Sequence, residues 1–319
     1  MSISPPVLFF VLGMVAVFLK SDLRIPRQIG KLMSLYLLWA IGFTGGVKIA
    51  DTGLDAEALW SIVIGVSLAA LQPFAVFAIL KRKLGAENAA AVAAAYGSVS
   101  AVTFLTASNL LDESSIAYGG HMVAVMALME SPAIAVSIIL LRRAQSSSGS
   151  TEKQASWGVI LHEAFLNGPV LLLLGSLIVG LITGERGFEA FKPLCKDLFN
   201  GVLVFFLLDL GVLAARRMRS FFAHGISLAL FGVIFPPVAA LIALMFAKFA
   251  GLTLGDATLL AVLASSASYI AVPAAARIAI PKAESSIYIG LALAVTFPFN
   301  VIIGIPLYLA FAKSIIGAS

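Results

Sequence analysis

The sequence predicts an all-α integral membrane protein with ten transmembrane helices, arranged as two inverted repeats of five helices each. Three observations lead to this prediction: the composition, the spacing of breaks between apolar segments, and landmarks that occur twice in the same order. Of the 319 residues, 61% are hydrophobic and only 12% are charged, with a mean hydropathy of +1.04. Soluble domains carry about 25% charged residues. This chain has too few to cover its surface in water, so a bilayer is its expected solvent.

Charged residues and Pro/Gly clusters divide the chain into ten apolar segments. The first segment is short for a bilayer crossing and is expected to be tilted or shielded by its neighbours, whereas the others are long enough to span. The ten segments cover residues 6–20, 29–48, 59–80, 87–110, 117–141, 157–183, 198–215, 222–249, 256–280 and 286–312.

The basic residues predict the orientation of the chain. With ten spans, fifteen Lys and Arg residues fall in loops on one side of the membrane and six in loops on the other. Cytoplasmic loops carry the excess of basic residues, so both termini are expected outside, in a bacterial inner membrane. This distribution accounts for the net charge of +5, and no nucleic-acid partner is expected.

Landmarks in the first half of the chain recur in the second half at offsets of 165, 164, 171 and 166 residues. Because each half holds an odd number of spans, the second half must insert upside down, which is typical of secondary transporters. The expected units are a first repeat at 1–143, a cytoplasmic linker at 144–155 and a second repeat at 156–319. The matched landmarks are Gly46-Val47 with Gly211-Val212, Pro73 with Pro237, Glu113-Ser114-Ser115-Ile116 with Glu284-Ser285-Ser286-Ile287, and Pro132 with Pro298.

The fourth segment of each half is interrupted by small and polar residues at mid-membrane. One interruption is YGSVS at 96–100, and the other lies in SSASYIAVPA at 265–274. Unpaired backbone groups in lipid cost several kcal/mol each, so a break is tolerated where it lines a cavity. Broken helices also direct N-terminal amides, with roughly half a positive charge, into that cavity. Two converging breaks therefore predict an anion site that needs no Arg or Lys.

The serines of these interruptions also suit close helix packing, because small side chains are enriched at transmembrane interfaces. This alternative applies to Ser98, Ser100, Ser266 and Ser268. Their placement at equivalent positions of the two repeats favours a binding site over packing.

Few ionisable residues lie inside the predicted spans, where a charge is expensive and usually functional. Glu130 lies in MESP at 129–132, and its counterpart region is TFPFN at 296–300. Carboxylate, amide, hydroxyl and freed carbonyl oxygens are hard ligands that suit an alkali cation. We interpret Glu130 as a cation ligand or proton carrier, with a hydrogen-bonded structural acid as the alternative.

The other ionisable residues in or near the spans carry weaker signals. Asp209 stands about two turns before a basic cluster, so pairing with Arg216 or Arg217 is as good an explanation as function. His121 and His162 have no metal-ligand partner at helical spacing and are interpreted as packing or interfacial residues.

The chain carries no enzyme motif. It has no G-x-x-x-x-G-K-[ST] loop, which excludes ATP as the driving force, and no H-E-x-x-H sequence. Its only cysteine, Cys195, excludes an intrachain disulfide or a cysteine metal cluster. No catalytic residue is expected, and no cofactor other than a coupling ion.

Several motifs follow one another over nearly the whole chain in an order that resembles the sodium-dependent bicarbonate transporter (SbtA) family. This resemblance implies two inverted five-helix repeats, core and gate subdomains, crossed broken helices, a homotrimer, and symport of bicarbonate with sodium. It also suggests a PII-like regulatory partner. The motifs are GFTGG at 42–46, AYGSVS at 95–100, ESPA at 130–133, Trp157 with Glu163 and Gly168-Pro169, ASSASYIAVP at 264–273 and RIAIP at 277–281.

Two departures from the family pattern bear on function. Cyanobacterial members carry an S-D-I-S-G-P type sequence where this chain reads SYIAVP at 268–273, so Tyr269 replaces an aspartate and Ala271 a serine. The ion site therefore has fewer oxygens. The linker between the fifth and sixth spans is also short here, which weakens the expectation of a PII-like regulator.

Carried over by position, the resemblance places the anion between 97–101 and 268–272, with sodium close by. The residues assigned to the anion are Gly97, Ser98, Val99, Ser100, Ala101, Ser268, Tyr269, Ile270 and Ala271. The residues assigned to sodium are Glu130, Thr103, Ser266 and Asn300.

Sodium-coupled uptake of a small anion, bicarbonate by resemblance, is the function that the sequence favours. A cation/proton antiporter or a sodium-coupled organic-anion symporter on the same scaffold remains open. The antiporter normally uses adjacent carboxylates or a buried Lys at the crossing, and neither interruption supplies one. A passive channel or a membrane sensor is a further alternative.

Overall fold

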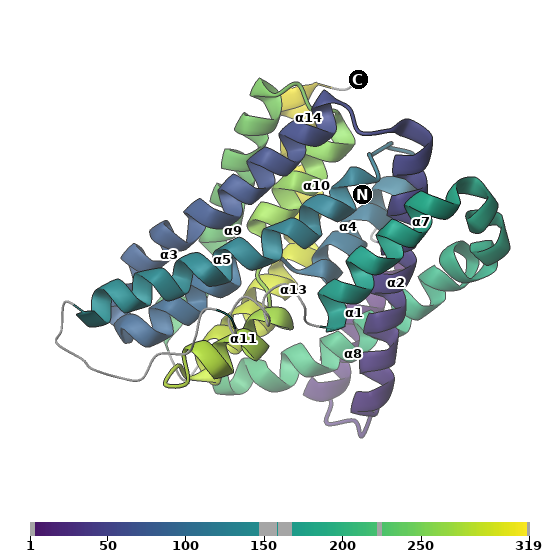
Figure 1. Ribbon diagram of the computed structural model, residues 1–319. Coiled ribbons are helices and arrows are strands. Elements are labelled where there is room, and N and C mark those ends of the chain that lie inside the picture. Colours follow the sequence, from purple (N-terminus) through teal and green to yellow (C-terminus); the bar gives the residue numbers. More distant parts are fainter. Residues whose placement is uncertain (1–3, 147–157, 159–167, 222–224, 318–319) are drawn as a thin grey trace.

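The computed structural model describes residues 4–146, 158, 168–221 and 225–317, and these residues are helical with no strand among them (Figure 1). Six helical stretches in this part of the chain are long and apolar enough to cross a membrane. Two of them have 58 and 51 residues, far more than the roughly 20 that one crossing needs. Both contain breaks in the helical path, described below. The apolar helices Pro5–Phe18 and Leu254–Ser265 are shorter.

The described residues 4–146 form five helices. Helix α3 holds two straight segments that meet at Gly85, whose φ of 77° lies in the left-handed region that favours glycine. This bend lies between the predicted spans 59–80 and 87–110. The five helices are α1 (Pro5–Phe18), α2 (Arg27–Thr52), α3 (Ala56–Gly97), α4 (Ala101–Glu113) and α5 (His121–Ser146).

The second half begins with α7 (Gly168–Lys192), which bends at Gly184, and continues through a π-helical turn, η1 (Pro193–Asp197). The remaining helices before the last span are α8 (Leu198–Phe221), α9 (Ile226–Phe249), α10 (Leu254–Ser265) and α11 (Ala271–Ala279).

The last helical run is continuous but contains two widened, π-helical stretches. Each of them includes the carbonyl four residues before a proline, Ala294 before Pro298 and Ile302 before Pro306. A proline has no N–H and its ring clashes with that carbonyl, so a wider turn relieves the conflict. The run consists of α12 (Ser285–Gly290), η3 (Leu291–Thr296), α13 (Phe297–Phe299), η4 (Asn300–Gly304) and α14 (Ile305–Ile316).

Some sequence features lie outside the described residues. These are linker residues 147–155, Trp157, His162 and Glu163.

Glycines allow two helix pairs, α2 with α7 and α1 with α8, to approach at backbone distance. A Cβ added at Gly46 would lie 1.9 Å from the Leu177 carbonyl oxygen, and one added at Gly211 would lie 2.1 Å from the Phe10 carbonyl oxygen. Real Cβ atoms do not approach so closely, so only glycine fits at either position. Figure 1 shows α2 and α7 side by side.

The contacts in these two helix pairs correspond to one another. Gly46 and Gly211 are the landmarks matched in the sequence, and their partners Leu177 and Phe10 are 167 residues apart. The reciprocal glycines, Gly180 facing the Phe43 carbonyl and Gly13 facing the Leu208 carbonyl, are also 167 residues apart.

A similar correspondence holds for one glycine contact in another pair of helices from each half. Gly65 of α3 packs against Val125 and Met129 of α5, whereas Gly232 of α9 packs against Leu291 and Val295 of η3.

The two halves also correspond in the hydrogen bonds formed at the starts of α5 and α12. Asn88 Oδ1 accepts from the Glu284 amide at 2.8 Å, and Asp256 Oδ1 accepts from the Gly119 amide at 2.7 Å.

Candidate functional site

Both segments that the sequence predicts to be interrupted leave the helical path in the structure. Residues 98–100 separate α3 from α4, and residues 266–270 separate α10 from α11. The two interruptions contact each other directly. The Ser268 amide donates to the Ala95 carbonyl at 2.8 Å, and the Ser100 amide donates to Ser266 Oγ at 2.9 Å. Two segments about 165 residues apart thus form a single structural unit.

The carbonyls freed at the end of α10 are satisfied by side chains. Gln72 Nε2 of α3 donates to the Ala264 carbonyl at 2.9 Å, and Asn300 Nδ2 of η4 donates to the Ser265 carbonyl at 2.9 Å. Together with Ala95, which accepts from Ser268, these carbonyls have partners within the protein, as buried backbone groups require. The break in α10 is therefore stabilised by the protein itself.

Unlike the carbonyls at the end of α10, two backbone amides at the start of α4 have no acceptor among the described residues. Ser100 Oγ accepts from the Thr103 amide at 3.2 Å, which caps the helix, but no described residue accepts from the amides of Ala101 or Val102. Helix N-termini with free amides attract anions. Ala101 and Val102 both border the cavity described next.

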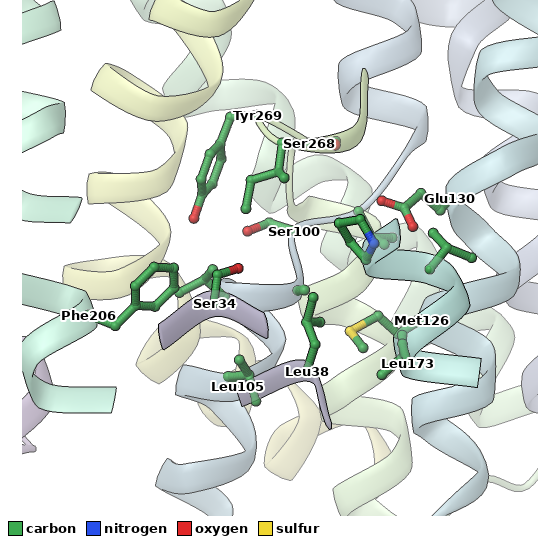
Figure 2. A pocket seen from close by; sticks show the side chains of 16 residues that line it. Ser34, Leu38, Ser100, Leu105, Met126, Glu130, Leu173, Phe206, Ser268 and Tyr269 are labelled. Carbon is green, nitrogen blue, oxygen red and sulfur yellow. The ribbon is translucent and has the colours of Figure 1, made fainter. Parts of the chain in front are cut away.

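A cavity of about 40 Å³ lies where the two interruptions meet helices α2, α5, α7 and α8 (Figure 2). One water needs about 10–15 Å³ of such space, so the cavity holds roughly three or four water-sized groups. Its lining residues are Ser34, Leu38, Val99, Ser100, Ala101, Val102, Leu105, Met126, Glu130, Pro169, Val170, Leu173, Phe206, Ser268, Tyr269 and Ile270.

The polar side chains that line the cavity are unevenly placed. The hydroxyls of Ser34, Ser100 and Tyr269 point toward one another, whereas Glu130 lies across the cavity from Tyr269 (Figure 2). The Tyr269 hydroxyl is buried and forms no hydrogen bond of good geometry with a described residue. No Lys, Arg or His is among the lining residues. Among the described lining residues, the one group that can carry a full charge is the Glu130 carboxylate.

Six of the nine residues assigned to the anion line this cavity, and three do not. Ser98 and Ala271 are buried behind the lining. Gly97 lies against α3 and α5, where an added Cβ would come within 2.6 Å of Pro73 and 2.8 Å of Ala133. Its backbone does not have a positive φ, so close packing is what requires glycine at this position.

Among the four residues assigned to sodium, Glu130 borders the cavity and the others do not. The Thr103 hydroxyl is buried without a partner. Ser266 Oγ donates to the Leu263 carbonyl at 2.8 Å, besides accepting from Ser100. Asn300 Oδ1 accepts from the Tyr308 hydroxyl at 2.8 Å, so both ends of its amide are engaged.

Some residues of the site carried no signal in the sequence. Ser34 and Phe206 line the cavity from α2 and α8, but a lone serine or phenylalanine in an apolar span is unremarkable. Tyr96 belongs to the first interruption, yet its role is structural: its hydroxyl bonds to Thr296 Oγ1, and its ring packs edge-on against Phe231 and Phe235. Gln72 is a polar residue in an apolar span with no polar neighbour in the local sequence, and this is the one signal that the sequence gives for its role.

A second group of polar residues lies at the other end of α4. His121 Nε2 approaches Asp256 Oδ2 at 3.1 Å, a partner that the sequence did not reveal for this histidine. Lys48 Nζ lies 3.8 Å from the centre of the Tyr118 ring, and the Tyr118 hydroxyl donates to Asp112 Oδ2 at 3.2 Å. Burial and the Asp112 carboxylate raise the pKa of Tyr118, which keeps this donor protonated.

Asp209 is buried on α8 beside Gly30 of α2, where an added Cβ would lie 2.7 Å from Asp209 Oδ2. It forms no ion pair with Arg216, whose Nη2 donates instead to the Leu23 carbonyl at 3.2 Å. The sequence suggested pairing with Arg216 or Arg217; Arg216 makes no direct contact of this kind, although its charge acts on the Asp209 carboxylate.

Apolar helices, interrupted at two places that meet over a small buried cavity, define a multi-pass membrane protein with the features of a transporter. A protein-family comparison agrees: residues 5–313 match the model of the Na⁺-dependent bicarbonate transporter superfamily. The chain therefore belongs to that superfamily, as its motifs suggested. A search of curated proteins found no match.

Proposed function

We propose that the protein is a secondary transporter that couples sodium to the uptake of a small anion, with bicarbonate as the ion that the superfamily description names. The observation that carries the proposal is the cavity at the meeting of the two interruptions. It combines free amides and hydroxyls, which suit an anion, with one carboxylate, which suits a cation. Because the site supplies both kinds of group, it suits a pair of ions better than one.

The anion would bind at the start of α4. The amides of Ala101 and Val102 have no acceptor among the described residues, and the positive end of the helix dipole lies there. Ser100 and Tyr269 would add hydroxyl donors on the same side (Figure 2). Hydrogen bonds to a charged group contribute about 1.5–3 kcal/mol each.

The sodium ion would bind at Glu130. A lone carboxylate repels an entering anion, and a charge at membrane depth is costly without a counterion. Sodium at Glu130 removes both penalties, so each ion favours the binding of the other. The Thr103 hydroxyl has no hydrogen-bond partner among the described residues and is the second ligand that we favour, although it does not itself border the cavity. Ser266 and Asn300 already form hydrogen bonds with protein groups, so they are weaker candidates.

The size of the cavity separates this proposal from one alternative. About 40 Å³ suits a small anion of four or so non-hydrogen atoms, which disfavours a large organic anion. A cation/proton antiporter is disfavoured because the lining residues that the structure describes include a single carboxylate and no lysine.

We also propose the ten-span inverted arrangement, with 1–143 and 156–319 as the repeats and both termini outside. The matched glycine contacts and the matched Asn88 and Asp256 bonds support it. A single cysteine in the 144–155 linker of a Cys195→Ser chain should resist an impermeant thiol reagent added outside intact cells. Labelling from outside would contradict the orientation. The homotrimer and the PII-like regulator remain expectations from the family resemblance.

Uptake by purified protein in liposomes tests the transport function. Radiolabelled bicarbonate should accumulate at alkaline pH, where little carbon dioxide is present, when an inward sodium gradient is imposed. A potassium gradient of the same size should give no accumulation. Equal uptake with both gradients would indicate a channel, and proton release on adding sodium would indicate an antiporter.

A further inference from the structure

Ser34 is the one polar residue that α2 contributes to the cavity. It lies one helical turn before Leu38, the other α2 residue of the lining, and on the same face of the helix. Figure 2 shows its hydroxyl directed toward those of Ser100 and Tyr269, which come from the two interruptions. The binding of anion and sodium described above leaves this hydroxyl without a role.

The Ser34 hydroxyl differs from other hydroxyls in the apolar helices. Serine and threonine in a helix commonly satisfy themselves by donating to a carbonyl three or four residues earlier. Thr44 does so on the same helix, donating to the Ala40 carbonyl at 2.9 Å, and Ser176 of α7 donates to the Leu173 carbonyl at 3.0 Å. Ser34 forms no hydrogen bond with a described residue and points into the cavity instead. No described group therefore competes with a ligand for its lone pairs.

The other polar groups on this side of the cavity are better suited to donate. The backbone amides of Ala101 and Val102 have no other capacity. Ser100 Oγ already accepts from the Thr103 amide at 3.2 Å, so part of its acceptor capacity is used. A phenol is a stronger acid than an alcohol and hence the better donor, which applies to Tyr269. Ser34 is thus the hydroxyl with the greatest capacity to accept.

Bicarbonate needs an acceptor as well as donors. Two of its oxygens share the negative charge and accept hydrogen bonds, whereas the third carries a proton and donates. Burying that hydroxyl without an acceptor carries a desolvation cost. Glu130 is the single carboxylate among the described lining residues. In the proposed function, on which the present inference rests, sodium occupies that carboxylate.

We propose that Ser34 accepts the hydrogen bond of the bicarbonate hydroxyl and so selects bicarbonate over anions that lack a hydroxyl. The two charged oxygens then lie at the amides of Ala101 and Val102, with the hydroxyls of Ser100 and Tyr269 as further donors. Bicarbonate has four non-hydrogen atoms, which match a cavity of about 40 Å³.

This assignment divides recognition between two parts of the molecule. Ser34 belongs to α2, which packs against α7 at Gly46, whereas the donors belong to the two interruptions. Bicarbonate bound in this way contacts both parts. An anion without a hydroxyl uses the donors of the interruptions and gains nothing from α2.

Isothermal titration of the purified full-length protein in detergent, at alkaline pH and constant sodium, tests the proposal with sodium bicarbonate and sodium formate as probes. Formate has the same charge and the same pair of charged oxygens, but hydrogen in place of the hydroxyl. Ser34→Ala should raise the dissociation constant for bicarbonate about tenfold, the scale of one buried hydrogen bond, and change that for formate by less than about twofold. Retained formate binding also shows that the variant is folded.

Thr44→Val is the matched control, because it removes a hydroxyl that bonds within α2 and does not border the cavity. It should leave the binding of both anions unchanged. An equal loss of bicarbonate and formate affinity in Ser34→Ala, or no loss of either, would overturn the role of Ser34 while leaving sodium-coupled anion transport intact. If the wild-type protein binds neither anion in sodium, the proposed function fails as well.

Discussion

The interruption at residues 98–100 is short and enclosed, whereas the one at 266–270 is longer and partly open. Ser98 and Ser100 are 0% and 4% exposed, but Ile270 is 42% exposed. The first is followed by a 13-residue helix that Ser100 caps, and the second by a 9-residue helix whose preceding residue makes no side-chain cap bond.

This difference indicates that the two interruptions contribute different groups to the cavity. The enclosed interruption is held by Pro73 and Ala133 and can present backbone amides in a fixed position. The open interruption presents the side chain of Tyr269 to the cavity. It is also where the chain departs from the family pattern. We therefore expect substitutions in the first to affect binding as a whole, and substitutions in the second to affect which anion is bound.

The largest effect is expected where the first interruption is packed most tightly. Gly97→Leu should abolish sodium-dependent uptake, because the side chain would displace the amides of α4 from the cavity. Gly97→Ala should lower the free energy of unfolding by about 1–3 kcal/mol through overpacking, measured by thermal denaturation in detergent. Gly175→Ala, on α7 with no atom near the added Cβ, is the control. Normal uptake by Gly97→Leu would show that the tight packing around Gly97 is not needed for transport.

Glu130→Gln tests the cation side of the cavity, which both interruptions share. The change keeps the shape and removes the charge, and a hard cation prefers a charged oxygen. The sodium concentration for half-maximal uptake should rise about tenfold or more, equivalent to about 1.4 kcal/mol, with folding unchanged. Glu189→Gln removes an exposed carboxylate paired with Lys192 and should have no effect. An unaltered sodium dependence in Glu130→Gln would return this residue to a structural role.

Two serines of the first interruption separate binding from packing. Ser100 borders the cavity and Ser98 does not, although both hydroxyls are buried. Ser100→Ala should raise the half-saturating anion concentration about tenfold, the scale of a hydrogen bond to a charged group. Ser98→Ala should raise it less. Equal effects in transport assays would mean that the first interruption does not act through the cavity surface.

The smallest effect on transport is expected at the outer ends of the interrupted segments. Asn88→Ala and Asp256→Ala each remove an acceptor for a helix-starting amide and should destabilise the protein by about 1 kcal/mol. Asp256→Ala should cost more, because it also removes the partner of His121. Anion affinity should change little in either variant. A large loss of affinity in one variant alone would show that the two ends are not equivalent.

The class of fold and the position of both interruptions were predictable from local composition. Glycine, serine and proline clustered in an apolar run mark either a break or close helix packing, and their placement at equivalent positions of the two halves favoured breaks. Glu130 was predictable for a related reason, since a carboxylate in an apolar segment requires a partner. The resemblance of its motifs also pointed to the superfamily, which the family match confirms.

The rest of the site was not predictable, because it comes from helices whose local sequences are ordinary. Ser34 and Phe206 reach the cavity only because α2 and α8 pack against the crossing. Asn300 carries the same oxygens as a cation ligand, but its amide is engaged by Ser265 and Tyr308. Whether a polar group is free or already paired depends on neighbours that are distant in the sequence.

Composition and the repeated landmarks were therefore enough to predict a helical membrane protein whose fourth and ninth apolar segments are interrupted. These features follow from the solvent, because lipid penalises charges and broken backbone wherever they occur along the chain. Tertiary packing alone decided which carbonyls were satisfied, which amides and hydroxyls stayed free, and that apolar walls would enclose most of the cavity. Those outcomes depend on contacts between segments about 165 residues apart, such as Ser268 with Ala95 and Ser100 with Ser266.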